Sequence, residues 1–280
     1  MKNFKFNAIT ALIVGLNMAA VNAADGPILN NGLDNTATGQ NVIVIGHKSV
    51  VGGENSTSIG TNTTADGINA LALGTDAKAK VTNPAAANSN KPANLIAIGT
   101  NAKSEAAETV AIGESAKASK HNANAFGSKA KAEGESSLAL GSGSYAKEDS
   151  SVAIGNDSNA TAKSSVALGE STNATAIFAT AVGDSATASG VRSFAAGLNS
   201  HAQSDDSIAI GANTNSTVRG ISIGAEASAY HQGISVGYKS NASGIGSIAT
   251  GVETSASGLS SIASGSNAVA SSTGSVAIGE

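Results

Sequence analysis

The residues that most often carry out enzyme chemistry are few in this sequence, and they do not form a set. Its four histidines could act as acid–base groups or metal ligands; they are His47, His121, His201 and His231. The aspartates and glutamates are scattered, and no pair recurs at a fixed spacing as acid–base catalysis would require. The sequence has no cysteine, which excludes disulfides and thiolate metal sites. We therefore expect no catalytic residues, no cofactor, no metal and no enzyme activity.

Motifs for nucleotides, calcium and nucleic acids are also missing. No serine lies in a Gly-x-Ser-x-Gly elbow, and the glycines do not form a phosphate-binding loop. Calcium-binding nonapeptides with the pattern Gly-Gly-x-Gly-x-Asp do not occur. The net charge is −4, whereas nucleic-acid binding needs a basic face, so we expect no nucleic-acid partner.

The first 23 residues predict a secretory signal peptide. Lys2 and Lys5 precede an apolar run from Ala8 to Val21, and Val21-Asn22-Ala23 has the small-x-small pattern of a cleavage site. The run is shorter than the ~20 residues of a transmembrane helix. The alternative is a buried N-terminal helix. We expect residues 1–23 to be removed from an exported protein.

The rest of the sequence consists of copies of one short unit. A glycine follows a short apolar run 17 times, and most of these glycines are 14 residues apart. They are Gly46, Gly60, Gly74, Gly99, Gly113, Gly127, Gly141, Gly155, Gly169, Gly183, Gly197, Gly211, Gly224, Gly237, Gly251, Gly265 and Gly279. One interval is 25 residues and two are 13. A period kept over so many copies predicts a repeat protein.

Each position of the unit has its own residue types, as in Ser151-Val152-Ala153-Ile154-Gly155. The residues one and three before the glycine are mostly Val, Ile or Leu, and the residue between them is nearly always Ala or Ser. Three residues after the glycine only Ala, Ser or Thr occurs, and five after it Ala dominates. The position between those two is polar and variable. The four histidines fall at different positions of the unit, so they cannot form a ladder.

Each unit contains two predicted strands. Side chains alternate between the faces of a strand, so the Val-Ala-Ile segment is apolar on both faces and needs cover on both sides. The Ala-x-Ala segment is small on one face and polar on the other, which is typical of a strand with one side in water. Stacked copies predict an all-β solenoid of two parallel sheets. Only 3% of the residues are aromatic, which favours many thin layers over one thick core.

The outer face of the Val-Ala-Ile strands has no cover within one chain. Repeated in every copy, it exceeds the apolar surface that a soluble monomer exposes. We therefore expect an obligate homo-oligomer with this face at the interface. The sequence leaves open whether the Val/Ile side or the Ala/Gly side faces the neighbouring chain.

The unit Ser-Val-Ala-Ile-Gly-x-x-Ser-x-Ala, present from Ser151 to Ala160, resembles the head repeat of trimeric autotransporter adhesins of the YadA type. The resemblance covers residues 41–280. It implies a left-handed parallel β-roll of 14-residue repeats, assembled as a homotrimer. It also implies a bacterial virulence factor at the cell surface, in the outer membrane. Such a protein attaches to host cells and to extracellular matrix proteins such as collagen, and promotes autoaggregation.

In the collagen-binding head of that family, binding has been linked to the repeated motif itself. Carried over, this points to a ligand-binding motif made of Ser151, Val152, Ala153, Ile154, Gly155 and Ser158. The alternative is that most of these residues are structural. Members of the family continue into a neck, a coiled-coil stalk and a membrane anchor. No heptad run follows the repeats here, so we expect membrane attachment only through an anchor that is not present in this chain.

Several segments depart from the repeat. Residues 24–40 are polar and rich in Gly and Asn, and predict a lead-in or N-terminal cap. Residues 80–94 contain two prolines and predict a loop insertion. The two 13-residue intervals predict a shortened turn. Asn124 and Phe126 replace the usual apolar pair and predict a local distortion of the coil that ends at Gly127.

Three functions are compatible with such a solenoid. The first is adhesion, and the second is a structural spacer without a ligand of its own. The third is binding to a regular solid such as ice, which needs a flat face with one aligned column, usually of Thr. The column three residues after the glycine mixes Ala, Ser and Thr, which argues against the third.

Overall fold

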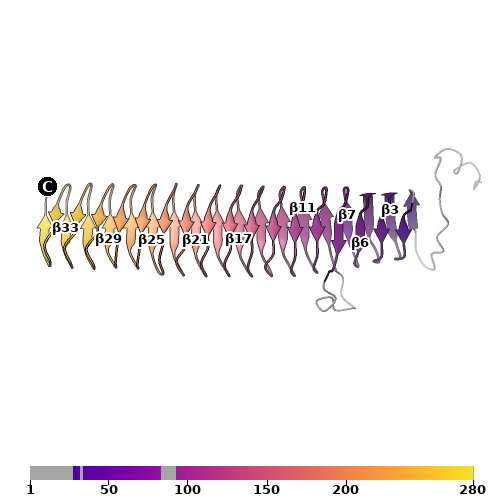
Figure 1. The fold of residues 1–280 in the computed structure, drawn as a ribbon, viewed down its shortest axis with the longest axis horizontal. Helices are drawn as coiled ribbons and strands as arrows, with labels where there is room; N and C mark the ends of the chain where they lie inside the picture. The colour runs from indigo at the N-terminus through magenta and orange to yellow at the C-terminus, as the bar shows by residue number, and fades with distance from the viewer. Residues whose placement is uncertain (1–27, 32–33, 83–92, 280) are drawn as a thin grey trace, which may run out of the picture. The chain divides into compact units, whose positions relative to one another are not determined.

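The computed structural model describes residues 28–31, 34–82 and 93–279. Within these residues the chain forms 35 strands and no helix, so the all-β solenoid expected from the repeat is confirmed. The chain divides into two compact units, residues 1–122 and 123–280. In each unit every coil contributes one strand from the Val-Ala-Ile segment and one from the Ala-x-Ala segment (Figure 1). The predicted signal peptide lies outside the described residues.

Unit 1 consists of two parallel sheets in which each strand pairs with its equivalent in the next coil. The first sheet contains β1 (Ile28–Asn31), β3 (Val42–His47), β5 (Thr57–Thr61), β7 (Leu71–Leu73), β9 (Ile96–Ile98) and β11 (Val110–Ile112). The second contains β2 (Thr36–Ala37), β4 (Val50–Val51), β6 (Thr64–Asp66), β8 (Lys78–Lys80), β10 (Lys103–Ser104) and β12 (Lys117–Ala118).

Unit 2 repeats this arrangement. Its first sheet contains β13 (Asn124–Phe126), β15 (Leu138–Leu140), β17 (Val152–Ile154), β19 (Val166–Leu168), β21 (Thr180–Val182), β23 (Phe194–Ala196), β25 (Ile208–Ile210), β27 (Ile221–Ile223), β29 (Ile234–Val236), β31 (Ile248–Thr250), β33 (Ile262–Ser264) and β35 (Val276–Ile278). Its second sheet contains β14 (Lys131–Ala132), β16 (Tyr145–Ala146), β18 (Asn159–Ala160), β20 (Asn173–Ala174), β22 (Thr187–Ala188), β24 (His201–Ala202), β26 (Asn215–Ser216), β28 (Ser228–Ala229), β30 (Asn241–Ala242), β32 (Ser255–Ala256) and β34 (Val269–Ala270).

Small side chains fill most of the interior, and in unit 1 Val42, Val44, Val51 and Leu95 join them. In the coil around Gly155 the small side chains are Ser151, Ala153, Ser158 and Ala160, and all four are fully buried. Val152 and Ile154, on either side of Ala153, point the other way and stay partly exposed. The structure thus answers the question that the sequence left open, because the Ala side of the strand faces inward and the Val/Ile side faces outward.

Two tight turns close each coil, and the repeat glycine begins one of them. Each turn holds a residue with positive φ, such as Asp157 (φ 52°) and Ser164 (φ 54°). Gly155 itself has a φ of 130°, a conformation that essentially only glycine adopts. A side chain there would also overlap the carbonyl group of Gly169 in the next coil. Both the turn and the close stacking of coils therefore require glycine at this position.

The pairing continues through the segments at which the repeat was expected to change. Strands β1 and β2 lie within residues 24–40 and pair in parallel with β3 and β4. Across the insertion, Leu71 of β7 aligns directly with Ile96 of β9, so the coil regains its register after it. Residues 83–92, which include both prolines of the predicted loop, lie outside the described residues.

The shortened turns are confirmed. Between β26 and β27 the turn has one residue fewer than the equivalent turn of a 14-residue coil, and the same holds between β28 and β29. Gly220 and Gly233 occupy the inward position where most coils have serine. A Cβ atom at Gly220 would lie 2.7 Å from the carbonyl oxygen of Thr217, so the tighter turn leaves no room for a side chain.

The distortion predicted for the coil that ends at Gly127 is wrong. Asn124 and Phe126 form a regular strand in register with Leu138 and Leu140. Both side chains are on the outward face, where their size is not limited by packing inside the coil. The inward residue, Ala125, keeps the small size that the interior requires.

Candidate functional site

The outward face of the first sheet is a continuous apolar surface within each unit. We call it the apolar face. Its side chains are partly exposed in the single chain, for example 37% for Ile210 and 39% for Ile223. In unit 2 it includes Leu138, Leu140, Val152, Ile154, Val166, Leu168, Val182, Phe194, Ile208, Ile210, Ile221, Ile223, Ile234, Val236, Ile248 and Ile262. Such a surface is typical of a protein–protein interface.

The predicted ligand-binding motif is divided between the interior and the apolar face. Ser151, Ala153 and Ser158 are fully buried, so a ligand outside the coil cannot contact their side chains. Val152 and Ile154 are on the apolar face and are partly exposed. The structure therefore brings the motif together as one coil, in which only two side chains are available to another molecule.

Many of the buried hydroxyl groups donate to backbone carbonyls at the turns. Ser158 Oγ donates to the carbonyl of Gly155 at 3.0 Å, and Ser165 Oγ donates to that of Ala162 at 2.6 Å. Thr254 Oγ1 donates to the carbonyl of Gly265 in the next coil at 2.7 Å. Buried polar groups need such partners. Where these bonds form, Ser and Thr hold the turns closed without a ligand. Five other buried serine hydroxyls have no partner among the described residues: Ser193, Ser200, Ser216, Ser247 and Ser261.

The outward face of the second sheet, which we call the polar face, is lined by hydrogen-bonding side chains. Asn159 Nδ2 donates to Asn173 Oδ1 in the next coil at 3.3 Å. Tyr145 Oη donates to Glu133 Oε2 at 2.9 Å, and the Lys131 ammonium lies 5.9 Å from the centre of the Tyr145 ring. This face is suited to water or to a polar ligand.

Tyr145 provides a spectroscopic test of the polar face. Burial and the hydrogen bond to Glu133 raise the pKa of Tyr145 to about 12 from the usual 10.0. We expect one of the three tyrosines to ionise late in an ultraviolet titration, and Glu133→Gln to lower that pKa part of the way. The pKa of Tyr145 is higher in the folded chain than in the unfolded chain. The protonated hydroxyl of Tyr145 therefore stabilises the fold below pH 10, and this contribution to the free energy of unfolding is lost between about pH 10 and 12. Ionisation of all three tyrosines together near pH 10 would contradict this arrangement.

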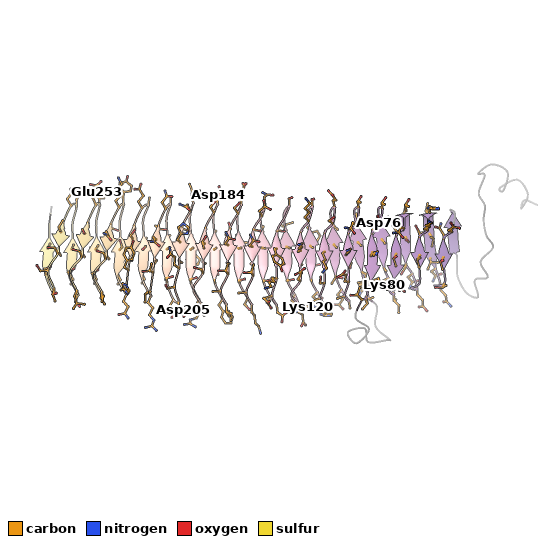
Figure 2. All side chains as sticks on the ribbon, in the orientation of Figure 1. Asp76, Lys80, Lys120, Asp184, Asp205 and Glu253 are labelled. Carbon is orange, nitrogen blue, oxygen red and sulfur yellow. The ribbon has the colours of Figure 1, made fainter. Side chains whose placement is uncertain are left out.

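The two edges of the solenoid are formed by turns that carry most of its charged groups. In unit 2, Asp184 and Glu253 lie on one edge and Asp205 on the other (Figure 2). On the edge of Asp205, Arg192 donates to both carboxylate oxygens of Asp206 in the next coil, at 2.7 and 2.8 Å. This hydrogen bonding holds the pKa of Asp206 below its usual range. Because the pair is exposed, we expect it to contribute little to stability.

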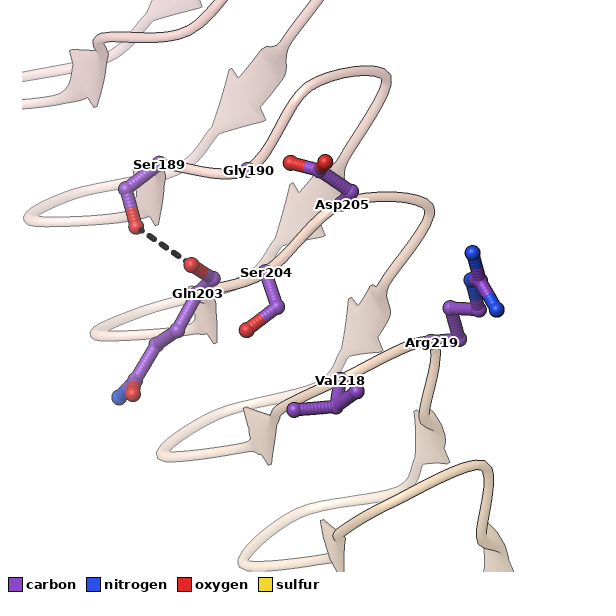
Figure 3. Close-up of a pocket in the computed structure, with 7 residues that line it drawn as sticks. All are labelled: Ser189, Gly190, Gln203, Ser204, Asp205, Val218 and Arg219. Atoms are coloured by element: carbon purple, nitrogen blue, oxygen red, sulfur yellow. Dashed lines mark hydrogen bonds between the residues drawn. The ribbon is translucent and has the colours of Figure 1, made fainter.

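A shallow hollow of about 550 Å³ lies on the same edge, beside the first shortened turn. Figure 3 shows it lined by Ser189, Gly190, Gln203, Ser204, Asp205, Val218 and Arg219. Ser189 Oγ donates to the carbonyl of Gln203 at 3.2 Å. None of these seven residues is a histidine or a cysteine.

The four histidines are separated, as their positions in the repeat predict. His47 Nε2 is 3.8 Å from Asp34 Oδ2, and His121 Nε2 is 3.4 Å from Glu108 Oε2. His201 Nε2 is 3.0 Å from Asn199 Oδ1. In the part of the chain that the structure describes, no three His, Asp or Glu side chains gather into a set that could bind a metal. The same residues include no helix long and apolar enough to cross a membrane.

Comparison with known proteins gives a match to a protein family and matches to solved structures. The family model for the YadA head domain repeat (2 copies) matches residues 37–63, 52–77, 65–83, 96–116, 105–130, 118–144, 132–158, 146–171, 160–186, 174–200, 188–214, 231–254 and 256–279, well over half of the chain. One of these solved structures is described as the crystal structure of the collagen-binding domain of the Yersinia adhesin YadA. It is 24% identical, with a TM-score of 0.32, and the match covers 73% of this chain and 79% of that one. No curated protein sequence matches the chain.

Proposed function

Because the chain belongs to the family of YadA head domain repeats, we propose that it is the head of a bacterial surface adhesin that attaches to extracellular matrix proteins or cells of a host. The observation that carries this proposal is the repeat itself, which matches the family over most of the chain. The structure supports it by converting the repeat into long, regular outward faces. We propose the same surfaces for autoaggregation between sibling cells.

We further propose that three chains assemble through their apolar faces. Each coil adds a pair of side chains such as Val152 and Ile154 to this face. Burying them removes apolar surface from water, at roughly 25 cal/mol for each Å². The same face recurs in coil after coil, so the free energy gained by burying apolar surface increases with the number of coils in each unit. The number three comes from the family, whereas the need for a partner comes from the face.

This assembly determines which surfaces remain for a ligand. Val152 and Ile154 would then lie in the interface, while Ser151, Ala153 and Ser158 are inside the coil. The motif would thus build the solenoid, and the ligand would contact the polar face. In this proposal, collagen binds a surface that includes the Asn159–Asn173 ladder of the polar face.

Export and attachment complete the proposal. Residues 1–23 would direct export as a signal peptide, and an anchor outside this chain would hold the head at the outer membrane. We propose that the head acts by binding alone, without catalysis.

The direct test measures binding of residues 24–280 to immobilised collagen and fibronectin. We expect saturable binding to at least one of them, and a loss of more than tenfold when Asn159 and Asn173 are both replaced by lysine, because the added charges block close contact with the polar face. Replacing Asn156 and Ser171 on a turn edge by lysine is the matched control and should leave binding nearly unchanged. No binding to matrix proteins or host cells would contradict the adhesin proposal.

A structural spacer is the second candidate, and one observation favours it. The repeated Ser, Ala and Gly residues are explained by interior packing, hydroxyl–carbonyl bonds and turns, without a ligand. A spacer would bind neither matrix proteins nor cells, yet it would form the same trimer. The binding assay therefore distinguishes the two functions, whereas the oligomeric state is the same for both.

A further inference from the structure

Three lysines stack in register on the polar face of unit 1. Lys78 of β8 aligns with Lys103 of β10, and Lys103 aligns with Lys117 of β12. Neighbouring parallel strands lie about 4.8 Å apart, so three positive charges are carried at this spacing along one line. We call these residues the lysine column. Like charges directly opposite one another on paired strands destabilise a sheet, so the column has a cost that the fold does not require.

Acidic side chains nearby offset this charge only in part. On the same face, Lys80 Nζ lies 2.9 Å from Asp66 Oδ2, and Lys117 Nζ lies 3.6 Å from Glu105 Oε2. In the described part of unit 1, Lys78 and Lys103 form no ion pair. Four lysines against two carboxylates leave this face of β6, β8, β10 and β12 with a net charge of +2. The whole chain, by contrast, has a net charge of −4.

The lysines are also accessible. Lys78 and Lys80 are exposed, and Lys103 and Lys117 are partly exposed. Their inward neighbours Ala79 and Ala118 are fully buried and fix the direction of the strands. Figure 2 shows Lys80 and Lys120 projecting on one edge of unit 1, away from Asp76 on the other. The positive groups therefore meet solvent on a rigid, regular surface.

We propose that the lysine column binds a linear sulfated polysaccharide that runs along the stacking direction, across the strands. Such a chain carries fixed anionic groups at short intervals, which would neutralise Lys78, Lys103 and Lys117 together and remove the cost of placing them in register. Clusters of basic residues are a known basis for heparin recognition. The inference deepens the proposed adhesin function, because it names a class of ligand for one part of the head.

Nucleic acid fits this surface less well. Single strands bind where bases stack on aromatic side chains, and the polar face of unit 1 has none between β6 and β12. Duplex DNA is wide and bears two rows of phosphates, so it favours a broad basic surface. The lysine column is one residue wide and has Asp66 and Glu105 beside it. A single narrow chain can follow the column and avoid these carboxylates.

The test measures binding of residues 24–280 to heparin, with titration of salt. We expect Lys78→Gln, Lys103→Gln and Lys117→Gln together to weaken binding tenfold or more and to make it less sensitive to salt, because fewer counterions are displaced. Replacing Lys129, Lys163 and Lys239 by glutamine removes the same charge from separate turns and should change the affinity less than twofold. Glu105→Gln should strengthen binding, since it removes a nearby negative charge and releases Lys117.

Three results would overturn the proposal. They are the absence of heparin binding at physiological salt, an equal loss in the control variant, and duplex DNA binding as tight as heparin with the same dependence on the column. Collagen and fibronectin binding is measured on the same samples. Loss of heparin binding alone, with matrix binding intact, would remove the lysine column as a site and leave the proposed function in place.

Discussion

Replacing Gly155 with alanine is expected to destabilise the solenoid by more than about 3 kcal/mol, because two separate costs add at this position. Its φ of 130° is a conformation that alanine avoids. In addition, the new methyl group would overlap the carbonyl of Gly169 in the next coil, so the two coils would have to move apart. Denaturation in guanidinium chloride, followed by circular dichroism, measures the loss.

Gly246 offers a matched control in the same unit. Its φ is also positive, at 64°, but the nearest atom to an added Cβ would be Ser260 Oγ at 3.9 Å. Gly246→Ala should therefore cost only about 1–2 kcal/mol, the usual penalty for a left-handed residue with a side chain. Equal and small effects of the two substitutions would show that close stacking of glycines does not hold the coils together.

Charges placed on the apolar face are expected to separate the chains. In the proposed trimer, Val152→Asp, Val166→Asp and Ile208→Asp would bury three unpaired carboxylates per chain, at a cost of several kcal/mol each. The mass measured by light scattering should fall from three chains toward one. The interior residues of these coils are unchanged, so a separated chain that stays folded should keep its β-sheet circular dichroism spectrum.

The control places the same charge on the polar face of the same unit. Asn159→Asp, Asn173→Asp and Ser228→Asp should leave the oligomer intact, because these partly exposed side chains remain in water in the proposed assembly. If both triple variants keep the mass of the unaltered protein, the apolar face does not form the interface.

The period and residue types of the sequence were enough to predict the architecture. The alternation of side-chain types along the chain predicted strands at Val-Ala-Ile and Ala-x-Ala, and the repeat glycines predicted the turns. Alternation could not determine which side of Val152-Ala153-Ile154 faces inward, because both sides are apolar. The structure decides it, since Ala153 is fully buried and Val152 stays partly exposed.

The candidate binding residues were harder to predict, because the sequence does not show which recurring residues are buried. The recurring motif attracted attention as a binding site, whereas its Ser151 and Ser158 are buried. A position that recurs in every coil is the one most constrained by packing. Phe126 was expected to distort its coil, but it lies on the outward face, where packing inside the coil does not limit the size of a side chain. The lysine column lies at the most variable position of the repeat, and comparing that position between successive copies would have revealed it.

The solution mass of residues 24–280, measured by light scattering, tests the proposed assembly through the apolar faces. We expect three chains per particle, held together by the apolar faces, at all concentrations at which the protein stays folded. A stable, soluble monomer would contradict this assembly, because a single chain would then tolerate in water the whole surface that we assign to the interface.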